Sequence, residues 1–309
     1  MHGQLFRCFS TLTISLSSLD VGASGGRAGR RAPTGARPPL RPAPTACPYG
    51  LPLRVGSARP ADLAPPPGVQ TVALDLTDPS TFPAAPAGVT AVFLYASADR
   101  VTDFVEQARR AGVDHVVVLS SSGVLGLLGP APKHDALAAS HLAVERALLA
   151  SPIETTLLRP GSFAANARAW AWPVKAGRPI SLPFPGAHSD PVHGKDVAEA
   201  AHAVLTDPRR RGGRFTLTGP ESPTFAEQID RLAAVTGLTV AYEHVTPEQW
   251  KKETAEHIPA AYADALLAWW RSTDGRPVDL TRTVEELTGH PAYSFTVWAA
   301  DHIAGFTTP

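Results

Sequence analysis

VTAVFLY at residues 89–95 and HVVVL at residues 115–119 are the two stretches that decide the fold. Each is a short, continuous apolar run, which is typical of a central strand in a parallel sheet that is covered on both faces. Between them, residues 102–111 carry Phe104 and Ala108 on one face of a predicted helix. This order of strand, helix and strand predicts a βαβ unit with a right-handed crossover.

The same alternation extends to both sides of this unit. Shorter strands are predicted at residues 53–56 and 69–74, a helix at 135–149 and a further strand at 153–158. Alternation at this spacing predicts an α/β fold with a doubly wound parallel sheet of the Rossmann type. Ligands of such sheets bind along the edge at which the parallel strands end.

After Pro160 the pattern loosens, and proline-rich loops separate shorter elements. We predict helices at 196–205, 224–236, from Pro247 and at 260–270, with strands at 214–217 and 240–245. Thr224 and Glu227 have the spacing of a helix capping box. The mixture predicts a small C-terminal α+β cap, so we divide the chain into an irregular segment (1–50), a nucleotide-binding core (51–160) and a substrate-binding part interleaved with the end of the core (161–309).

Composition excludes several classes of partner. The 309 residues include 28 basic and 28 acidic side chains, so the formal net charge is zero and nothing indicates nucleic acid. No apolar run approaches the roughly 20 residues that span a bilayer. The two cysteines, Cys8 and Cys47, both lie in the first fifty residues, so the rest of the chain has no thiolate ligand for a metal. No group of His, Asp and Glu residues has the spacing of metal ligands along the sequence. We expect a cytoplasmic protein, a monomer or homodimer, without a metal.

The first fifty residues differ from the rest, because they hold arginines, no lysine or glutamate, and Asp20 as the one acidic residue. Three interpretations stay open: an organelle transit peptide, a disordered tail, or a wrongly specified start such as a shifted reading frame. Residues 16–20 are too polar for a buried central strand. The chain then enters the regular pattern abruptly at Leu51.

Ordered motifs from Ala111 onward carry a resemblance to a known family. They are Ala111-Gly112-Val113, Leu119-Ser120-Ser121-Ser122-Gly123, Leu158-Arg159-Pro160-Gly161-Ser162-Phe163, Pro191-Val192 with Lys195-Asp196-Val197-Ala198, and Phe215-Thr216-Leu217-Thr218-Gly219-Pro220-Glu221 with Pro223-Thr224-Phe225-Ala226-Glu227. In this order, over about residues 51–304, the chain resembles the NmrA-like branch of the atypical short-chain dehydrogenases/reductases. The resemblance implies a Rossmann fold that binds NAD(P).

The resemblance also implies which residues hold the cofactor. Gly22, Gly25 and Gly29 resemble the family's glycine-rich phosphate-binding turn, with one extra residue before the last glycine; the alternative is a structureless segment. The remaining implied cofactor contacts are Ser57, Arg59, Asp75, Ala96, Ser120, Pro160 and Gly161. An arginine after the second strand favours a 2′-phosphate, and therefore NADP, with NAD possible. Arg59 as a surface side chain and Asp75 as a helix N-cap are the alternatives.

The family's catalytic positions are altered in this chain. Ser121 fills the serine position, whereas His141 and Glu145 stand where typical members have a tyrosine and a lysine. Their i, i+4 spacing puts both on one helix face, so Glu145 could orient His141 as a proton donor. The alternative is an ordinary surface pair. Family position makes Phe163, Asn166, Trp170 and Trp172 a candidate substrate wall, with core packing as the alternative. For His193, where relatives often have an acidic residue, we expect a capping role.

Three functional hypotheses follow. The first is an NAD(P)H-dependent oxidoreductase that acts on a small carbonyl, quinone or sugar-nucleotide-like substrate. The second is a non-catalytic NAD(P)-binding redox sensor or regulatory protein, which the loss of the tyrosine and lysine favours. The third is a non-functional product of a wrongly specified start.

Overall fold

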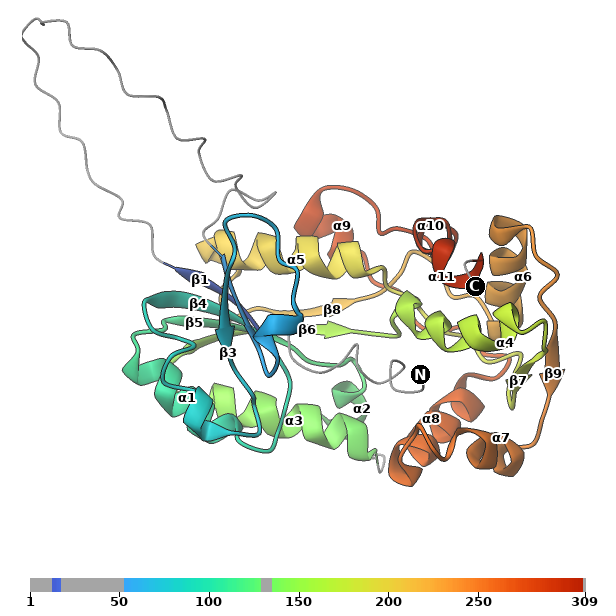
Figure 1. Cartoon of the computed structure of the whole chain (residues 1–309), viewed down its shortest axis with the longest axis horizontal. Helices are drawn as coiled ribbons and strands as arrows, with labels where there is room; N and C mark the ends of the chain where they lie inside the picture. Colours follow the sequence, from blue (N-terminus) through green and yellow to red (C-terminus); the bar gives the residue numbers. More distant parts are fainter. Residues whose placement is uncertain (1–12, 18–52, 129–134, 308–309) are drawn as a thin grey trace, which may run out of the picture.

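The computed structural model describes residues 13–17, 53–128 and 135–307 (Figure 1). A seven-stranded sheet has the order β3-β2-β1-β4-β5-β6-β8. Its strands are β1 (Thr13–Ser17), β2 (Leu53–Ser57), β3 (Gln70–Ala73), β4 (Val89–Tyr95), β5 (His115–Leu119), β6 (Glu154–Pro160) and β8 (Arg214–Leu217). All of these strands except β1 run in one direction. The edge at which they end is called the carboxyl edge below.

Helices cover both faces of this sheet because its central strands are apolar on both faces. Along β4, Val92 and Leu94 pack with α1 (Val101–Arg110) and α3 (Ala136–Leu149), whereas Phe93 between them packs with α5 (Gly194–Thr206) and α9 (Thr283–Thr288). Successive strand side chains point to opposite faces, so one continuous apolar run serves two cores. Figure 1 shows the resulting three layers, with α1 and α3 on one side and α5 and α9 on the other.

Strand β1 occupies the centre of the sheet but runs against its neighbours. It pairs antiparallel with β2 and with β4, so that Thr13 lies opposite Gly56 and Ser17 lies opposite Val89. The prediction that residues 16–20 form no central strand is therefore wrong for Leu16 and Ser17. A strand between β2 and β4 pairs backbone groups that both would otherwise leave unsatisfied, which polar side chains do not prevent.

The direction of β1 decides where the chain continues. In a doubly wound sheet, the first strand ends at the carboxyl edge, and the phosphate-binding turn follows there. Here Ser17 lies beside Val89, at the start of β4, and the chain re-enters the sheet at Leu53, at the same opposite edge. The three glycines Gly22, Gly25 and Gly29 lie outside the described residues.

A second lobe lies beyond the carboxyl edge, toward which β6 and β8 point (Figure 1). It holds the small parallel sheet of β7 (Ile180–Leu182) and β9 (Tyr242–His244). Its helices are α4 (Ala171–Lys175), α6 (Phe225–Thr236), α7 (Pro247–Thr254), α8 (Ala260–Thr273), α10 (Phe295–Asp301) and α11 (Ala304–Thr307). The predicted small α+β cap is thus confirmed, and it has cores of its own around Trp298 and Trp250.

Most predicted elements are confirmed within a residue or two. β4, β5 and β8 have the predicted bounds, and Thr224 and Glu227 form both bonds of the predicted capping box. The short elements α2 (Val124–Leu128), α4, α9, α10, α11 and β7 were not predicted, because they are too short to show a period. In the described part of the chain, no helix is both long and apolar enough to cross a membrane.

Candidate active site at the carboxyl edge of the sheet

The centre of the carboxyl edge is the turn that follows β5. Two backbone hydrogen bonds tie this turn to the end of β6: the N–H of Ser120 donates to the Leu158 carbonyl over 2.7 Å, and that of Ser122 donates to the Pro160 carbonyl over 2.9 Å. Ser120 and Pro160, both implied cofactor contacts and both buried, are therefore held next to each other. The bonds leave little freedom in the backbone that a bound ligand would meet.

A buried ion pair lies directly behind this turn. Arg159, at the end of β6, donates from Nε and Nη2 to the two carboxylate oxygens of Glu145 over 2.8 and 2.6 Å. The Ser120 hydroxyl donates to the same carboxylate over 2.6 Å. The side chains of Arg159 and Glu145 are 6% and 1% exposed. Two strand ends and helix α3 are thus joined by charge-assisted hydrogen bonds out of contact with water.

This ion pair changes the role expected for Glu145. The sequence suggested that Glu145 orients His141, but both carboxylate oxygens are engaged by Arg159 and Ser120, so the structure does not give it that role. His141 is half-buried, and its Nδ1 has no hydrogen-bond partner among the described residues. Burial lowers the pKa of His141, and the nearby negative charge of Glu145 only partly opposes this. The lowered pKa favours the neutral imidazole form of His141.

Ser121 is held by its own turn, because its hydroxyl accepts the N–H of Gly123 over 3.1 Å. The serine that reaches into the buried network is its neighbour Ser120. Of the predicted catalytic residues, Ser121 lies in the turn after β5, and His141 and Glu145 lie on α3. A hydrogen bond from Ser120 joins Glu145 to this turn.

Asp190 is a buried carboxylate that sequence reasoning missed. It accepts the backbone N–H of Ser162 over 2.9 Å, immediately after Gly161. A Cβ atom at Gly161 would lie 1.8 Å from a carboxylate oxygen of Asp190, so only glycine fits between the end of β6 and this side chain. Burial raises the pKa of Asp190 to about 6. Gly161 is thus explained by close packing, which is independent of any cofactor contact.

The end of β2 carries Ser57 and is followed by Arg59, two of the implied cofactor contacts. Ser57 is buried, and its hydroxyl accepts the N–H of Arg59 over 3.1 Å. The Arg59 side chain is 58% exposed and makes a long ion pair with Asp62 at 3.8 Å. A weak, exposed pair of this kind leaves the guanidinium accessible to an anion.

Asp75 and Ala96 lie at the next two strand ends. The Asp75 carboxylate accepts the N–H and the hydroxyl of Thr77 over 2.9 and 2.7 Å, and these bonds lower its pKa. These bonds close a local turn, whereas the N-cap of the short 3-10 helix that follows is Asp78, so the alternative of an N-cap role does not hold for Asp75. Ala96 follows β4, and its N–H approaches the Leu119 carbonyl at 3.4 Å. Its short side chain leaves room beside the β5 turn.

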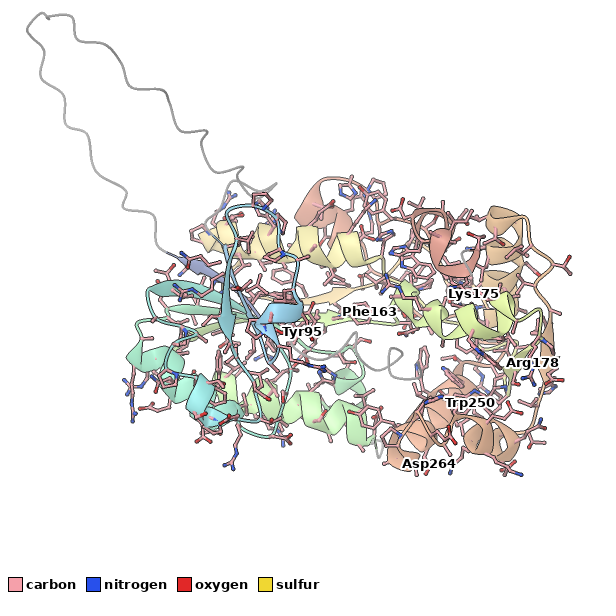
Figure 2. The ribbon with its side chains drawn as sticks, viewed as in Figure 1. Tyr95, Phe163, Lys175, Arg178, Trp250 and Asp264 are labelled. Carbon is pink, nitrogen blue, oxygen red and sulfur yellow. The ribbon has the colours of Figure 1, made fainter. Side chains whose placement is uncertain are left out.

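The predicted aromatic wall does not form as one surface. Phe163 is half-buried after β6 and lies between the sheet and the second lobe in Figure 2. Asn166 is exposed. Trp170 instead packs in the second lobe, with its ring centroid 6.4 Å from that of Phe225, so the alternative of core packing holds for it. Trp172 is 60% exposed, with the guanidinium of Arg178 over its ring.

His193 has the expected capping role. It is the N-cap of α5, and its Nδ1 accepts the N–H of Lys195 over 3.0 Å. Its Nε2 lies 3.3 Å from Asp301, which also binds the ammonium group of Lys195. No local pattern indicated Asp301 or Asp190, because each finds its partner only when distant segments meet. A charged residue at the end of an apolar strand was the one available signal for Arg159.

Fold and site together define a dinucleotide-binding α/β protein, and comparison with known proteins identifies the family. The family model described as NAD(P)H-binding matches residues 52–208, and the chain belongs to this family. The NmrA-like atypical short-chain dehydrogenase/reductase assignment is confirmed, and the family is one of NAD(P)H-dependent oxidoreductases.

Two bacterial relatives match most of both chains. The NAD(P)H azoreductase of Xenophilus azovorans is 30% identical over 250 residues, covering 77% of this chain and 84% of the relative. The (4-alkanoyl-5-oxo-2,5-dihydrofuran-3-yl)methyl phosphate reductase of Streptomyces griseus is 29% identical over 243 residues, covering 77% and 85%.

Among solved structures, similar folds are found at lower identity. The NADPH-dependent quinone oxidoreductase of Escherichia coli has a TM-score of 0.63 at 22% identity, covering 76% of this chain and 83% of that one. A nucleoside-diphosphate-sugar epimerase of Staphylococcus aureus has a TM-score of 0.66 at 17% identity, covering 80% and 90%. At these identities the likeness establishes the fold alone.

Proposed function

We propose that the protein is an NADPH-dependent reductase of a small, electron-poor acceptor such as a quinone or a conjugated carbonyl. The observation that carries the proposal is the set of small side chains at the ends of β2, β4 and β5, namely Ser57, Ala96 and Ser120, with the exposed Arg59 guanidinium beside the first of them. This arrangement suits a dinucleotide laid along the carboxyl edge. NADPH would supply the hydride when bound.

The residues fit the adenosine side of such a cofactor better than its phosphates. Arg59 would pair with a 2′-phosphate, and Ser57 holds the backbone of that turn in place. The first strand, in contrast, leaves the sheet at the opposite edge, so no glycine-rich turn stands at the carboxyl edge among the described residues. Cofactor binding is therefore the first property to measure.

The protonation of His141 favours an acceptor that needs no strong acid. A neutral imidazole can donate a hydrogen bond to a developing oxyanion, but it is a weaker proton donor than imidazolium. Quinones and conjugated carbonyls spread the negative charge left by hydride addition. We assign hydrogen bonding to the acceptor oxygen to His141 and Ser121. Relatives named for the reduction of azo compounds and of an oxo-dihydrofuran phosphate agree with such acceptors.

The first test is calorimetric titration of the full 309-residue protein with NADPH and with NADH. Arg59→Ala is expected to weaken NADPH binding about tenfold and to leave NADH binding unchanged, since only NADPH carries the 2′-phosphate. Arg100→Ala is the matched control, because Arg100 is also an exposed arginine, 56% exposed, with a long ion pair to Asp103 at 3.7 Å. Equal weakening of both cofactors by Arg59→Ala would remove the argument for NADPH.

The second candidate function is a non-catalytic sensor of NAD(P). It is favoured by Glu145, which stands at the family's lysine position and is committed to Arg159. A relative from Gibberella fujikuroi, 30% identical over 258 residues, is named a nitrogen metabolite regulation-like protein. Oxidation of bound NADPH by a panel of quinones and enones separates the two. Tight binding without turnover of any acceptor would support the sensor.

A further inference from the structure

Three side chains that could hold a metal meet away from the proposed cofactor site. Asp196 and Glu199 are three residues apart on α5, and His290 comes from the turn after α9. One ligand atom of each lies within 4.8 Å of the other two. Spacing of i, i+3 puts both carboxylates on one face of the helix, and the turn that carries His290 folds over that face.

The hydrogen bonds of His290 prepare it as a ligand. Its Nδ1 lies 2.8 Å from the carbonyl oxygen of Pro291, which can only accept, so Nδ1 carries a hydrogen. Its Nε2 lies 2.5 Å from Oε2 of Glu199. In the neutral ring, two acceptors would face each other, so a proton or a metal cation must lie between them. Histidines that bind metals usually donate the other ring N–H to a carbonyl or carboxylate in this manner.

Asp196 adds a second, independent indication of a cation. The residue is fully buried, and its Oδ2 accepts the N–H of Tyr293 over 3.0 Å. Its Oδ1 has no hydrogen-bond partner in the part of the chain that the structure describes. A buried carboxylate with a free lone pair is costly unless a cation compensates it.

We propose that Asp196, Glu199 and His290 form a binding site for one divalent transition-metal ion, with Zn²⁺ the best match. One imidazole and two carboxylates are typical zinc ligands, whereas Mg²⁺ and Ca²⁺ prefer oxygen ligands alone. Zn–N and Zn–O bonds of about 2.0–2.2 Å put tetrahedral ligand atoms about 3.3 Å apart. Glu199 and His290 must therefore separate slightly, which their 28% and 35% exposed side chains allow.

The ion would fasten the turn at residues 290–293 to the start of α5. The proposal departs from the expectation of no metal, which considered spacing along the sequence only. Glu199 and His290 are 91 residues apart, so no local pattern could show them together. None of the three residues belongs to the proposed cofactor site, so the metal proposal stands or fails independently of the reductase proposal.

The test is titration of the full-length, metal-free protein with ZnSO₄ by calorimetry, with CoCl₂ as a spectroscopic probe. We expect one zinc per chain, and visible Co²⁺ bands of a tetrahedral site without thiolate charge-transfer absorption. His290→Ala, which changes a half-exposed side chain, is expected to weaken zinc binding at least about tenfold. Asp196→Asn should do the same, because it keeps the acceptor for Tyr293 and removes the charge.

Two controls keep the result specific. His257→Ala removes a half-buried histidine in the turn after α7 and should leave the zinc affinity unchanged. Thiolates are strong zinc ligands, so the two cysteines could bind zinc at another place in the chain. A Cys8→Ser, Cys47→Ser variant tests this and should bind zinc as the wild type does. Absence of zinc binding by folded wild-type protein would overturn the proposal. Unchanged binding by folded His290→Ala, or loss of binding in the cysteine variant, would also overturn it.

Discussion

Replacing Arg159 with methionine tests the ion pair behind the candidate active site. Methionine keeps most of the length of the arginine side chain and removes both hydrogen bonds to Glu145, 2.8 and 2.6 Å long. The carboxylate of Glu145, 1% exposed, would then keep only the Ser120 hydroxyl as a partner. Removing one partner of a buried pair costs about 3–5 kcal/mol, since the remaining charge stays buried.

The magnitude is large beside the usual stability of a folded domain, about 5–15 kcal/mol. We therefore expect a large fall in the urea midpoint of Arg159→Met, followed by circular dichroism. Replacing both partners, Arg159→Met with Glu145→Leu, removes both charges and is expected to cost less than either single change. The difference between the double variant and the sum of the singles measures the coupling of the pair.

An exposed pair with similar geometry serves as the control. Arg109 donates two hydrogen bonds of 2.9 Å to Glu106 on the surface of α1. Because water replaces the lost partner there, Arg109→Met should leave the urea midpoint nearly unchanged. The reasoning is refuted if Arg159→Met costs no more than Arg109→Met, or if the effects of the two single changes at the buried pair simply add.

Further predictions concern Asp190, Gly161 and the cap of α6. Burial raises the pKa of Asp190 from 3.8 to about 6, so between about pH 4 and pH 6 the folded protein keeps a proton that the unfolded chain has lost. Stability therefore falls as the pH rises through this window. In thermal unfolding at pH 8, Asp190→Asn should be more stable than the wild type by about 1–3 kcal/mol. No gain in stability at pH 8 would contradict this prediction. Gly161→Ala should lower stability by about 1–3 kcal/mol in urea, because its Cβ overlaps Asp190; a neutral change would show that the two segments separate freely. Thr224→Ala removes a capping-box bond to Glu227 and should cost about 1 kcal/mol, whereas Thr206→Ala at the last turn of α5 is the comparison expected to cost less.

The layered fold could be predicted because its signals are local. The continuous apolar runs of β4 and β5 indicate strands covered on both faces, and the structure packs their alternate side chains into separate cores. The capping box of α6 lies within four residues and was therefore visible in the sequence. Short elements such as β7 and α10 were missed because neighbours in space, rather than a periodic pattern, hold them in place.

The candidate site could be predicted only in part. Family position led to Ser120, Ser57 and Arg59, and the structure puts each at a strand end of the carboxyl edge. The sequence could not show that Arg159 binds Glu145. Helical spacing indicates which side chains share a face of the helix, but not which residues pack against that face. The direction of β1 could not be predicted either. Whether a strand pairs parallel or antiparallel depends on the path of the connecting chain, and no local pattern shows that path.

The sequence by itself determined the order of the longer strands and helices after residue 50, the two-faced burial of the central strands and the family to which the chain belongs. These properties follow from the spacing of apolar residues and from the order of short motifs, and each of these signals spans only a few residues. Only the tertiary structure decided that Arg159 neutralises Glu145, that Asp190 closes against Gly161 and that Asp196, Glu199 and His290 meet. Such contacts join segments far apart in the chain, and burial makes their charges matter because water no longer screens them.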